Sequence, residues 1–298
     1  MPKVSGMHKL LIISGPTATG KTKLAVALAK TYHGELISAD SRQVYRGIDV
    51  ISGKDKNELE GIPLWLTDVA SVHEQFSVSL FHKLAMPVID AIYARGKLPI
   101  IVGGTGLYIQ SIIAPPETID IPPDSIARER WDALPVPDLQ RELRQKDAER
   151  FARMNISDRN NARRLIRALE VAKWQEAHPA TVAPMRAFDV YWIGLQRDMS
   201  VLCDLIAKRV DLRWDTGALD EQKKLPPTFT ATGVTPIRAY LQGERSETEA
   251  KAAWVREEVS YAKRQMTWFR KQPDIHWFDA GAPDVVRSIE RNVGSWYT

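Results

Sequence analysis

The sequence predicts an α/β fold, in which a parallel sheet forms the core and a helical domain is inserted into it. Short apolar runs alternate with segments whose apolar residues recur at helical spacing, which is typical of βαβ units. From residue 115 the composition changes to prolines and then to charged helical sequence. We therefore expect a core domain of residues 1–114 and 186–298 and a helical insertion of residues 115–185. The expected strands are 10–13, 35–39, 100–102 and 188–195, and the expected helices include 23–30, 77–94, 158–174 and a long last helix that opens with a capping box at Ser246.

The composition is that of a globular protein, with 298 residues of which 44% are hydrophobic and 26% charged. Cys203 is the single cysteine, which excludes a disulfide framework and a cysteine-rich zinc site. No apolar run reaches the roughly 18 residues of a membrane span, and the N-terminus lacks the pattern of a signal peptide. We expect a cytoplasmic protein without membrane contact, and a monomer.

The segment after the first expected strand fits the pattern G-x-x-x-x-G-K-[ST], whose backbone amides cradle a phosphate chain. The amides point inward at the start of a helix, where the helix dipole favours an anion. The lysine adds a positive charge, and the last hydroxyl of the pattern is the usual Mg²⁺ ligand, so we expect Mg²⁺ as cofactor with Thr22 as its ligand. The expected phosphate-binding residues are Gly15, Pro16, Thr17, Ala18, Thr19, Gly20, Lys21 and Thr22.

Polar residues follow the carboxyl ends of the expected strands, where ligands collect in parallel sheets. Asp40 follows the second strand, and Thr105 lies in the Gly-rich segment after the third. We expect Thr22, Asp40 and Thr105 to meet at one crevice. Because the third strand ends without a carboxylate, only Asp40 could hold the metal of a kinase or ATPase. The motif alone leaves open whether Asp40 binds metal or carries the chemistry.

Two helices carry cationic surface. Residues 141–173 contain ten Lys or Arg against five Asp or Glu, which indicates a polyanionic partner. In the last long helix, cations such as Arg264 are interleaved with aromatics such as Trp268, a pattern that suits phosphates and exposed bases. The alternative is a solvated helix face with Trp268 packed into the core.

Four further segments of the chain stand out: DSRQVYRG at 40–47, VGGTGLY at 102–108, RLIRALEV at 164–171 and YAKRQMTWF at 261–269. Together with the phosphate loop, they resemble the signature blocks of the tRNA dimethylallyltransferases. This family prenylates N6 of the adenosine 3′ to the anticodon of tRNA. The resemblance spans nearly the whole chain in the right order, and it implies a P-loop NTPase-like core with a helical insertion.

The resemblance also implies roles for individual residues. Dimethylallyl diphosphate would occupy the phosphate loop, with Arg209 as a further diphosphate-binding arginine. Asp40 would accept the proton of the attacking amine, so that Asp40, Thr105 and Arg209 form the expected catalytic set. The tRNA anticodon stem-loop is the expected partner. The positions that match its contacts are Asp40, Ser41, Arg42, Gln43, Thr105, Arg163, Arg164, Leu165, Ile166, Arg167, Arg264, Gln265 and Trp268.

The chain departs from the family's pattern at residues 232–235, at Leu64 and Trp65, and at Arg213, where a methionine is usual. These departures concern the RNA fit and the outer wall of the prenyl channel. Three other function classes are possible alternatives: an adenylate isopentenyltransferase, a P-loop kinase or ATPase, and a non-catalytic RNA-binding protein. The Arg-rich insertion argues against the first, and the strand end without a carboxylate argues against the second. Intact Lys21, Thr22 and Asp40 argue against the third.

Overall fold

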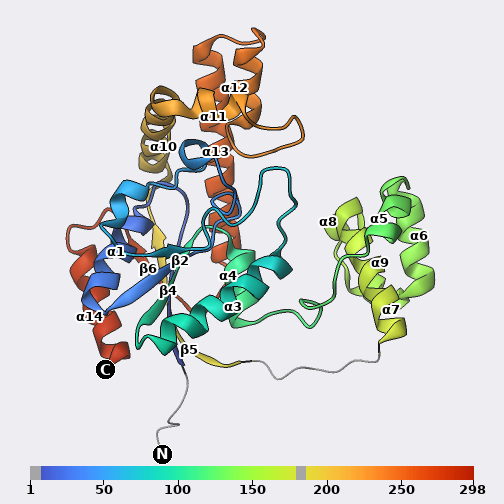
Figure 1. The fold of residues 1–298 in the computed structure, drawn as a ribbon, viewed down its shortest axis with the longest axis horizontal. Coiled ribbons are helices and arrows are strands. Elements are labelled where there is room, and N and C mark those ends of the chain that lie inside the picture. Colours follow the sequence, from blue (N-terminus) through green and yellow to red (C-terminus); the bar gives the residue numbers. More distant parts are fainter. Residues whose placement is uncertain (1–7, 179–185) are drawn as a thin grey trace, which may run out of the picture. The chain divides into compact units, whose positions relative to one another are not determined.

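The computed structural model describes residues 8–178 and 186–298, which divide into two compact units (Figure 1). The first unit combines Met1–Ala114 with Arg186–Thr298, and the second is Pro115–Met185. The division falls where Pro115 and Pro116 interrupt the alternation of strands and helices. Each unit has a hydrophobic core of its own, so each is described separately.

The first unit is built on a six-stranded sheet in which all paired strands are parallel. The strand order is β3-β2-β4-β1-β5-β6. The four predicted strands are present, and two short edge strands, β3 and β6, were not predicted. Bounds are β1 (His8–Ser14), β2 (Gly34–Ser38), β3 (Leu64–Trp65), β4 (Leu98–Gly103), β5 (Phe188–Gln196) and β6 (Ile275–Asp279).

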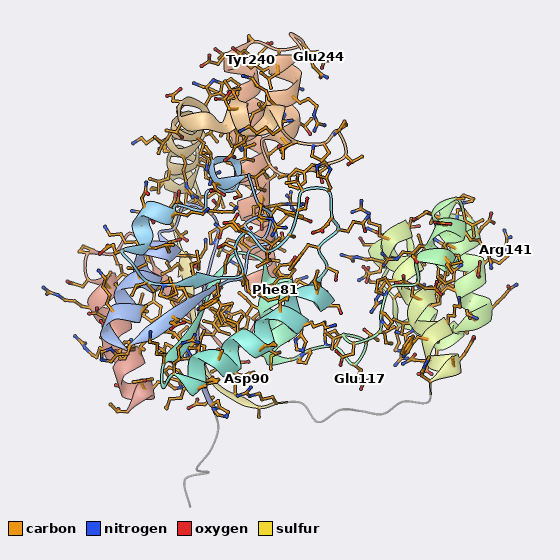
Figure 2. All side chains as sticks on the ribbon, in the orientation of Figure 1. Phe81, Asp90, Glu117, Arg141, Tyr240 and Glu244 are labelled. Atoms are coloured by element: carbon orange, nitrogen blue, oxygen red, sulfur yellow. The ribbon has the colours of Figure 1, made fainter. Side chains whose placement is uncertain are left out.

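Both faces of this sheet are covered, which explains why the strands are continuously apolar. Leu11 and Ile13 of β1 pack with α1 (Lys21–Thr31) and α14 (Val285–Tyr297). Leu10 and Ile12 point to the opposite face, which is covered by α3 (Val78–Ala94), α4 (Gly106–Ile113) and further helices. On that face Phe81, labelled in Figure 2, stacks on Tyr108 of α4 with ring centroids 4.2 Å apart.

A second group of helices lies beyond the carboxyl ends of the strands in the first unit (Figure 1). The helix α13 begins with the predicted capping box, in which Ser246 and Glu249 satisfy each other's backbone amides. It packs along α10 and α12, and one of its ends reaches α4 beside the sheet. The group comprises α10 (Met199–Arg213), η2 (Trp214–Ala218), α11 (Leu219–Lys223), α12 (Val234–Leu241) and α13 (Glu247–Phe269); α2 (Asp49–Ser52) and η1 (Lys56–Leu59) lie in the loop after β2.

The regular secondary structure of the second unit consists only of helices among its described residues, after an irregular segment over 115–124. The predicted helix 158–174 is α9 (Ala162–Ala177), which starts later because α8 (Ile156–Arg159) ends first and Asn161 then caps α9 by accepting a hydrogen bond from the Arg164 amide. A small core holds the five helices together. They are α5 (Ser125–Asp132), α6 (Val136–Lys146), α7 (Ala148–Arg153), α8 and α9, and the core includes Trp131, Leu139, Leu143, Phe151, Leu165 and Leu169.

Candidate active site

The phosphate loop connects β1 to α1, as its sequence pattern predicts. Gly15 has a φ of +145°, and a Cβ there would lie 2.4 Å from the Leu195 carbonyl oxygen. Gly20 adopts the left-handed conformation at the N-cap of α1. Both positions therefore require glycine. Within the loop, the Thr19 hydroxyl donates to the Pro16 carbonyl at 2.8 Å, which fixes the turn.

Gln265 of α13 supports this loop from outside. Its Oε1 accepts a hydrogen bond from the Thr17 amide at 3.1 Å, and its Nε2 donates to the Gly104 carbonyl at 3.0 Å. The side chain is buried, with both ends of its amide on protein backbone. Gln265 thus connects the phosphate loop to the end of β4. The sequence analysis predicted that Gln265 contacts RNA and did not predict this supporting role.

Lys21 and Arg209 bring two positive charges to the loop. Lys21 Nζ donates to the Pro16 carbonyl at 2.7 Å, and Arg209 Nη1, from α10, donates to the Thr17 hydroxyl at 3.1 Å. Burial, and then the charge of Arg209, lowers the pKa of Lys21 to about 8, although Asp40 and Glu258 act in the opposite direction. The loop is therefore short of negative charge, as expected of a site that binds an anion.

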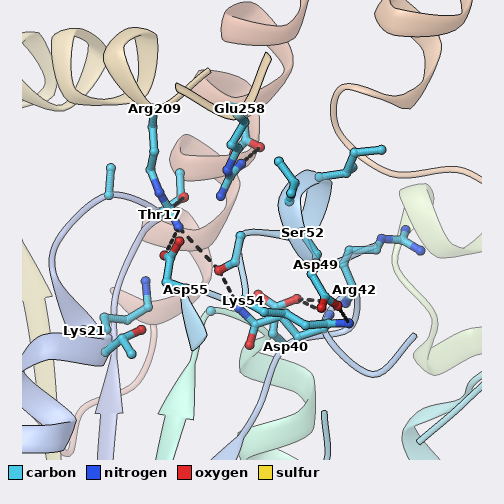
Figure 3. Close-up of a pocket in the computed structure, with 18 of the residues that line it drawn as sticks. Thr17, Lys21, Asp40, Arg42, Asp49, Ser52, Lys54, Asp55, Arg209 and Glu258 are labelled. Atoms are coloured by element: carbon cyan, nitrogen blue, oxygen red, sulfur yellow. Dashed lines mark hydrogen bonds and ion pairs between the residues drawn. The ribbon is translucent and has the colours of Figure 1, made fainter. Parts of the chain in front are cut away.

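Asp55 was missed by the sequence analysis. Its carboxylate forms an ion pair with Arg209 Nη2 (Figure 3), and it reaches Arg209 from the loop that contains α2 and η1. No local pattern predicts this contact, because 154 residues separate the two side chains. Asp55 thus occupies one edge of the guanidinium that Arg209 would otherwise present to a phosphate.

Asp40 lies at the carboxyl end of β2 with a fixed orientation. Its Oδ1 accepts hydrogen bonds from the amides of Arg42 at 2.8 Å and Gln43 at 3.3 Å. Neither interaction uses Oδ2, and within the described residues no hydrogen bond to that oxygen is found. One carboxylate oxygen therefore holds the side chain in place, and the other is left for a ligand.

Thr105, after β4, lies next to this carboxylate segment. Its Oγ1 accepts a hydrogen bond from the Ser41 amide at 3.0 Å. Burial raises the pKa of Tyr261 of α13, Asp40 raises it further, and the nearby Thr105 side chain acts the other way. The predicted convergence is confirmed for Thr22 and Asp40, which line one crevice together with Gly104, whereas Thr105 lies directly behind that lining and not in it.

The crevice is a cavity of about 790 Å³ that the loop, the segment after β2, α10 and α13 enclose (Figure 3). One wall carries phosphate-binding and acidic groups, and the wall formed by α10 and α13 mixes apolar with polar side chains. Its lining includes Thr17, Ala18, Gly20, Lys21, Thr22, Asp40, Arg42, Gln43, Val50, Gly53, Asp55, Arg209, Leu212, Arg213, Thr232, Glu258, Tyr261 and Gln265.

The oxygen ligands in this cavity fit a magnesium ion only together with a phosphate ligand. Among the described residues, no group of three or more His, Cys, Asp or Glu could hold a metal by itself. The Thr22 hydroxyl and the Asp40 carboxylate both line the cavity. Because Mg²⁺ binds through one or two protein oxygens and otherwise through water and phosphate, this sparse set is compatible with it.

A second cavity, of about 660 Å³, adjoins the first. Arg42, Thr232 and Tyr261 line both cavities and therefore form the boundary between them. The second cavity is markedly cationic, since four arginines line it: Arg42, Arg245, Arg256 and Arg264. Ser41 lines it as well, whereas Arg245, Arg256 and Tyr261 were not among the predicted contacts.

Comparisons with known proteins agree with this arrangement. The family model described as IPP transferase matches residues 43–272. The chain belongs to the IPP transferase family. A tRNA dimethylallyltransferase from an Exiguobacterium species is 41% identical over 284 residues, which cover 91% of this chain and 90% of that protein.

Solved structures of tRNA isopentenylpyrophosphate transferases have the same fold. The enzyme from Bacillus halodurans is 37% identical, with a TM-score of 0.71 over 97% of this chain and 96% of that one. The enzyme from Staphylococcus epidermidis is 30% identical, with a TM-score of 0.68 over 97% of this chain and 99% of that one. In the part of this IPP transferase that the structure describes, no helix has the length and apolar character needed to cross a membrane.

Several predicted RNA contacts of this IPP transferase are occupied by protein. Gln43 Nε2 donates to the Gly53 carbonyl at 3.1 Å, and its Oε1 accepts from Ser38 at 2.8 Å. Trp268 is half-buried over Gly106, where a Cβ would lie 2.1 Å from the indole ring. Trp268 thus packs against the core with its side chain partly exposed, and its contact with RNA stays a prediction.

The second unit corrects part of the prediction for α9. Leu165 and Ile166 lie in its hydrophobic core, so their side chains do not contact RNA. Arg167 is not in that core, but its Nη2 donates to the carbonyls of Thr118 at 2.8 Å and Ile121 at 3.0 Å, which gives it a structural role. Exposed arginines remain at Arg163 and at Arg164, although Arg164 is paired with Asp158.

Proposed function

We propose that this chain transfers a dimethylallyl group from dimethylallyl diphosphate to N6 of the adenosine 3′ to the anticodon of tRNA, giving N6-(dimethylallyl)adenosine. One observation carries the proposal beyond family membership. Asp40 lies in the anion-binding cavity, and the residues directly after it, Ser41 and Arg42, line the arginine-rich cavity next to it. A carboxylate with a free oxygen thus lies between a place for a diphosphate and a place for a polynucleotide.

The donor's diphosphate would be bound by the loop amides, Lys21 and Arg209. As the allylic C1–O bond breaks, its electron pair stays on the diphosphate, so negative charge grows beside these groups. Preorganised donors at the site of developing charge lower the barrier because they need no reorganisation during the reaction. When bound at Thr22, Mg²⁺ would neutralise part of the same charge.

The exocyclic amine of adenine is a weak nucleophile because its lone pair is delocalised into the ring. The N6 lone pair forms the new bond to C1, and N6 must give up one proton as it does so. Asp40 Oδ2 is the group placed to accept that proton, while Oδ1 stays on the amides of Arg42 and Gln43. The target base cannot react inside a stacked loop, so it must be turned outward into the cavity.

The RNA backbone would be bound by arginines of both units. In the first unit these are Arg42, Arg245, Arg256 and Arg264 of the second cavity, and in the second unit Arg163 and Arg164. Contacts to phosphates give affinity and position without reading sequence. We also propose that the protein acts as a monomer in the cytoplasm, where its substrate tRNA is found.

The experiment that tests this function is a transfer assay with the purified chain. Dimethylallyl diphosphate labelled in the prenyl group is incubated with Mg²⁺ and an unmodified tRNA transcript, and the digested nucleosides are analysed by mass spectrometry. We expect dimethylallyladenosine from the tRNA and none from AMP. Transfer to AMP instead, or ATP consumption with a phosphoryl acceptor and no prenyl transfer, would contradict the proposal.

A further inference from the structure

Arg213 is a buried cation whose interactions are incomplete. It lies one helical turn after Arg209 on α10 and is 7% exposed. Its Nη1 forms an ion pair with Glu258 Oε1 at 3.2 Å, but its buried Nε has no hydrogen-bond partner. Burial lowers the pKa of Arg213, and the charge of Arg209 lowers it further. A buried arginine with unused donors is costly unless something else binds it.

The guanidinium groups of Arg213 and Arg209 converge on one point above Gly53. A Cβ built on Gly53 would lie 1.9 Å from Arg213 Nη2 and 2.6 Å from Arg209 Nη2. Gly53 also has a φ of +62°, so both its backbone conformation and its close neighbours require glycine. Two positively charged nitrogens are thus held close together, in the wall of the cavity that contains the phosphate loop. Such an arrangement is stable only where negative charge is supplied to it.

The two carboxylates that supply this charge are held differently. Asp55, which pairs with Arg209, has a side chain that is 37% exposed and belongs to a loop. Glu258, which pairs with Arg213, is 6% exposed, and its Oε1 also accepts hydrogen bonds from the Thr232 hydroxyl at 2.9 Å and Trp254 Nε1 at 3.4 Å. An incoming anion can therefore replace Asp55 easily, whereas Glu258 stays in place.

We propose that Arg213 is a second diphosphate-binding arginine, which contacts the prenyl donor together with Arg209 and is positioned by Glu258 and Thr232. The inference rests on the proposed function, because it assumes that the donor's diphosphate lies in this cavity. Within the described residues, Arg213 Nη2 makes no hydrogen bond, and it is the donor available to a phosphate oxygen.

Two departures from the family's pattern are explained by this arrangement. Arg213 stands where a methionine is usual, and Thr232 belongs to the divergent segment 232–235. Both side chains bind the same oxygen of Glu258. The three residues thus form one unit, in which Thr232 and Glu258 hold Arg213 in place.

The test is the affinity of the full chain for inorganic pyrophosphate, measured by calorimetry for the wild type and for Arg213→Met. A charged hydrogen bond to a phosphate contributes enough that its loss should weaken binding about 10- to 100-fold. Arg213→Lys keeps the positive charge but not the two parallel donors of the guanidinium, so its pyrophosphate affinity should lie between those of the wild type and Arg213→Met. Lys224→Met, at an exposed lysine directly after α11 that lines neither cavity, should change the affinity by less than about threefold, because solvent screens its charge.

Steady-state kinetics separate this role from a purely structural one. If Arg213 binds the donor, Arg213→Met raises KM for dimethylallyl diphosphate and lowers kcat, with KM for tRNA unchanged. Unchanged pyrophosphate affinity in Arg213→Met, with binding still lost in Lys21→Met, would overturn the inference and leave the proposed function standing. Unchanged affinity in Lys21→Met as well would place the diphosphate elsewhere and overturn both. If Arg213→Met does not fold, Arg213→Lys decides by the same criterion.

Discussion

Arginines on two helices of this protein have different interactions. On α9, in the second unit, Arg167 donates hydrogen bonds to the carbonyls of Thr118 and Ile121, and Arg164 pairs with Asp158. On α10, in the first unit, Arg209 and Arg213 are brought together above Gly53 with donors left over. A run of arginines in a sequence therefore does not by itself mark a binding surface. What marks one is the shortage of acceptors around the guanidinium groups.

The largest expected effect is at Asp40, the proposed proton acceptor. Asp40→Asn keeps the shape and the contact of Oδ1 but removes the proton acceptor, so turnover should fall by about 10²–10⁴. Affinities for pyrophosphate and tRNA should be nearly unchanged in the same variant. A loss of Mg²⁺ affinity, with normal turnover at saturating metal, would instead identify Asp40 as a metal ligand.

Arg209→Ala should produce the next largest loss. Removing one preorganised donor from a developing anion costs about 2.7–4 kcal/mol of transition-state stabilisation, or roughly 10²–10³ in rate. The loss should be seen in kcat/KM for the prenyl donor. An effect confined to KM for tRNA would show that Arg209 belongs to the RNA surface, and the contrast between α9 and α10 would fail.

The pKa of Lys21 predicts how donor affinity depends on pH. In the free protein Lys21 has a pKa of about 8, so above that pH it loses its proton, and a diphosphate must restore it on binding. Pyrophosphate affinity should therefore fall as pH rises above about 8, by at most roughly tenfold per unit, and this lysine should add no dependence below. In Arg209→Gln the fall should begin at higher pH, since Arg209 is the second cause of the lowered pKa. Calorimetry across a pH series, with Lys21→Met as the control, measures both.

A gain of affinity is expected from Asp55→Asn. The substitution removes the carboxylate that competes with phosphate for Arg209 while keeping the side chain's size. Because partly exposed ion pairs contribute about 0.2–1 kcal/mol, pyrophosphate should bind about 1.4- to fivefold more tightly. Weaker binding would mean that Asp55 helps to hold the ligand, for instance through Mg²⁺.

The smallest effects separate the structural arginines from those that bind RNA. Arg264→Ala should weaken tRNA binding and flatten its salt dependence by somewhat less than one unit of log–log slope. Arg167→Ala should leave the slope unchanged and destabilise the second unit by about 1–3 kcal/mol, because three acceptors lose their partner. Affinity across a salt series, together with thermal unfolding of each variant, distinguishes the two roles. A flattened slope for Arg167→Ala would reverse the assignment.

The parts of the site that the sequence predicted are those that follow from local pattern. The phosphate loop and the positions of Asp40 and Thr105 at strand ends depend on neighbours along the chain, and they were predicted correctly. The parts that were missed depend on distant contacts. Glu258 meets Arg213 across 45 residues, and Asp55 meets Arg209 across 154, so no spacing rule connects them.

The same limit explains the errors in the second unit and at the sheet edges. Arg167 looked like a surface cation, because the carbonyls that bind it belong to residues 118 and 121, far from α9 in the sequence. The strand β3 has two residues, too few to show a period. For Trp268, spacing alone could not decide between a base-stacking surface and the core, since a half-buried aromatic belongs to both patterns.

The 23 residues of α13 form one continuous helix, and this has a consequence for how the two substrates bind. The helix carries Arg256 and Arg264 into the arginine-rich cavity, and further along it carries Gln265, which holds the Thr17 amide of the phosphate loop. RNA that shifts this helix therefore also shifts the support of the loop. If bound RNA changes the affinity for the prenyl donor by some factor, thermodynamic reciprocity requires that bound donor change the affinity for RNA by the same factor.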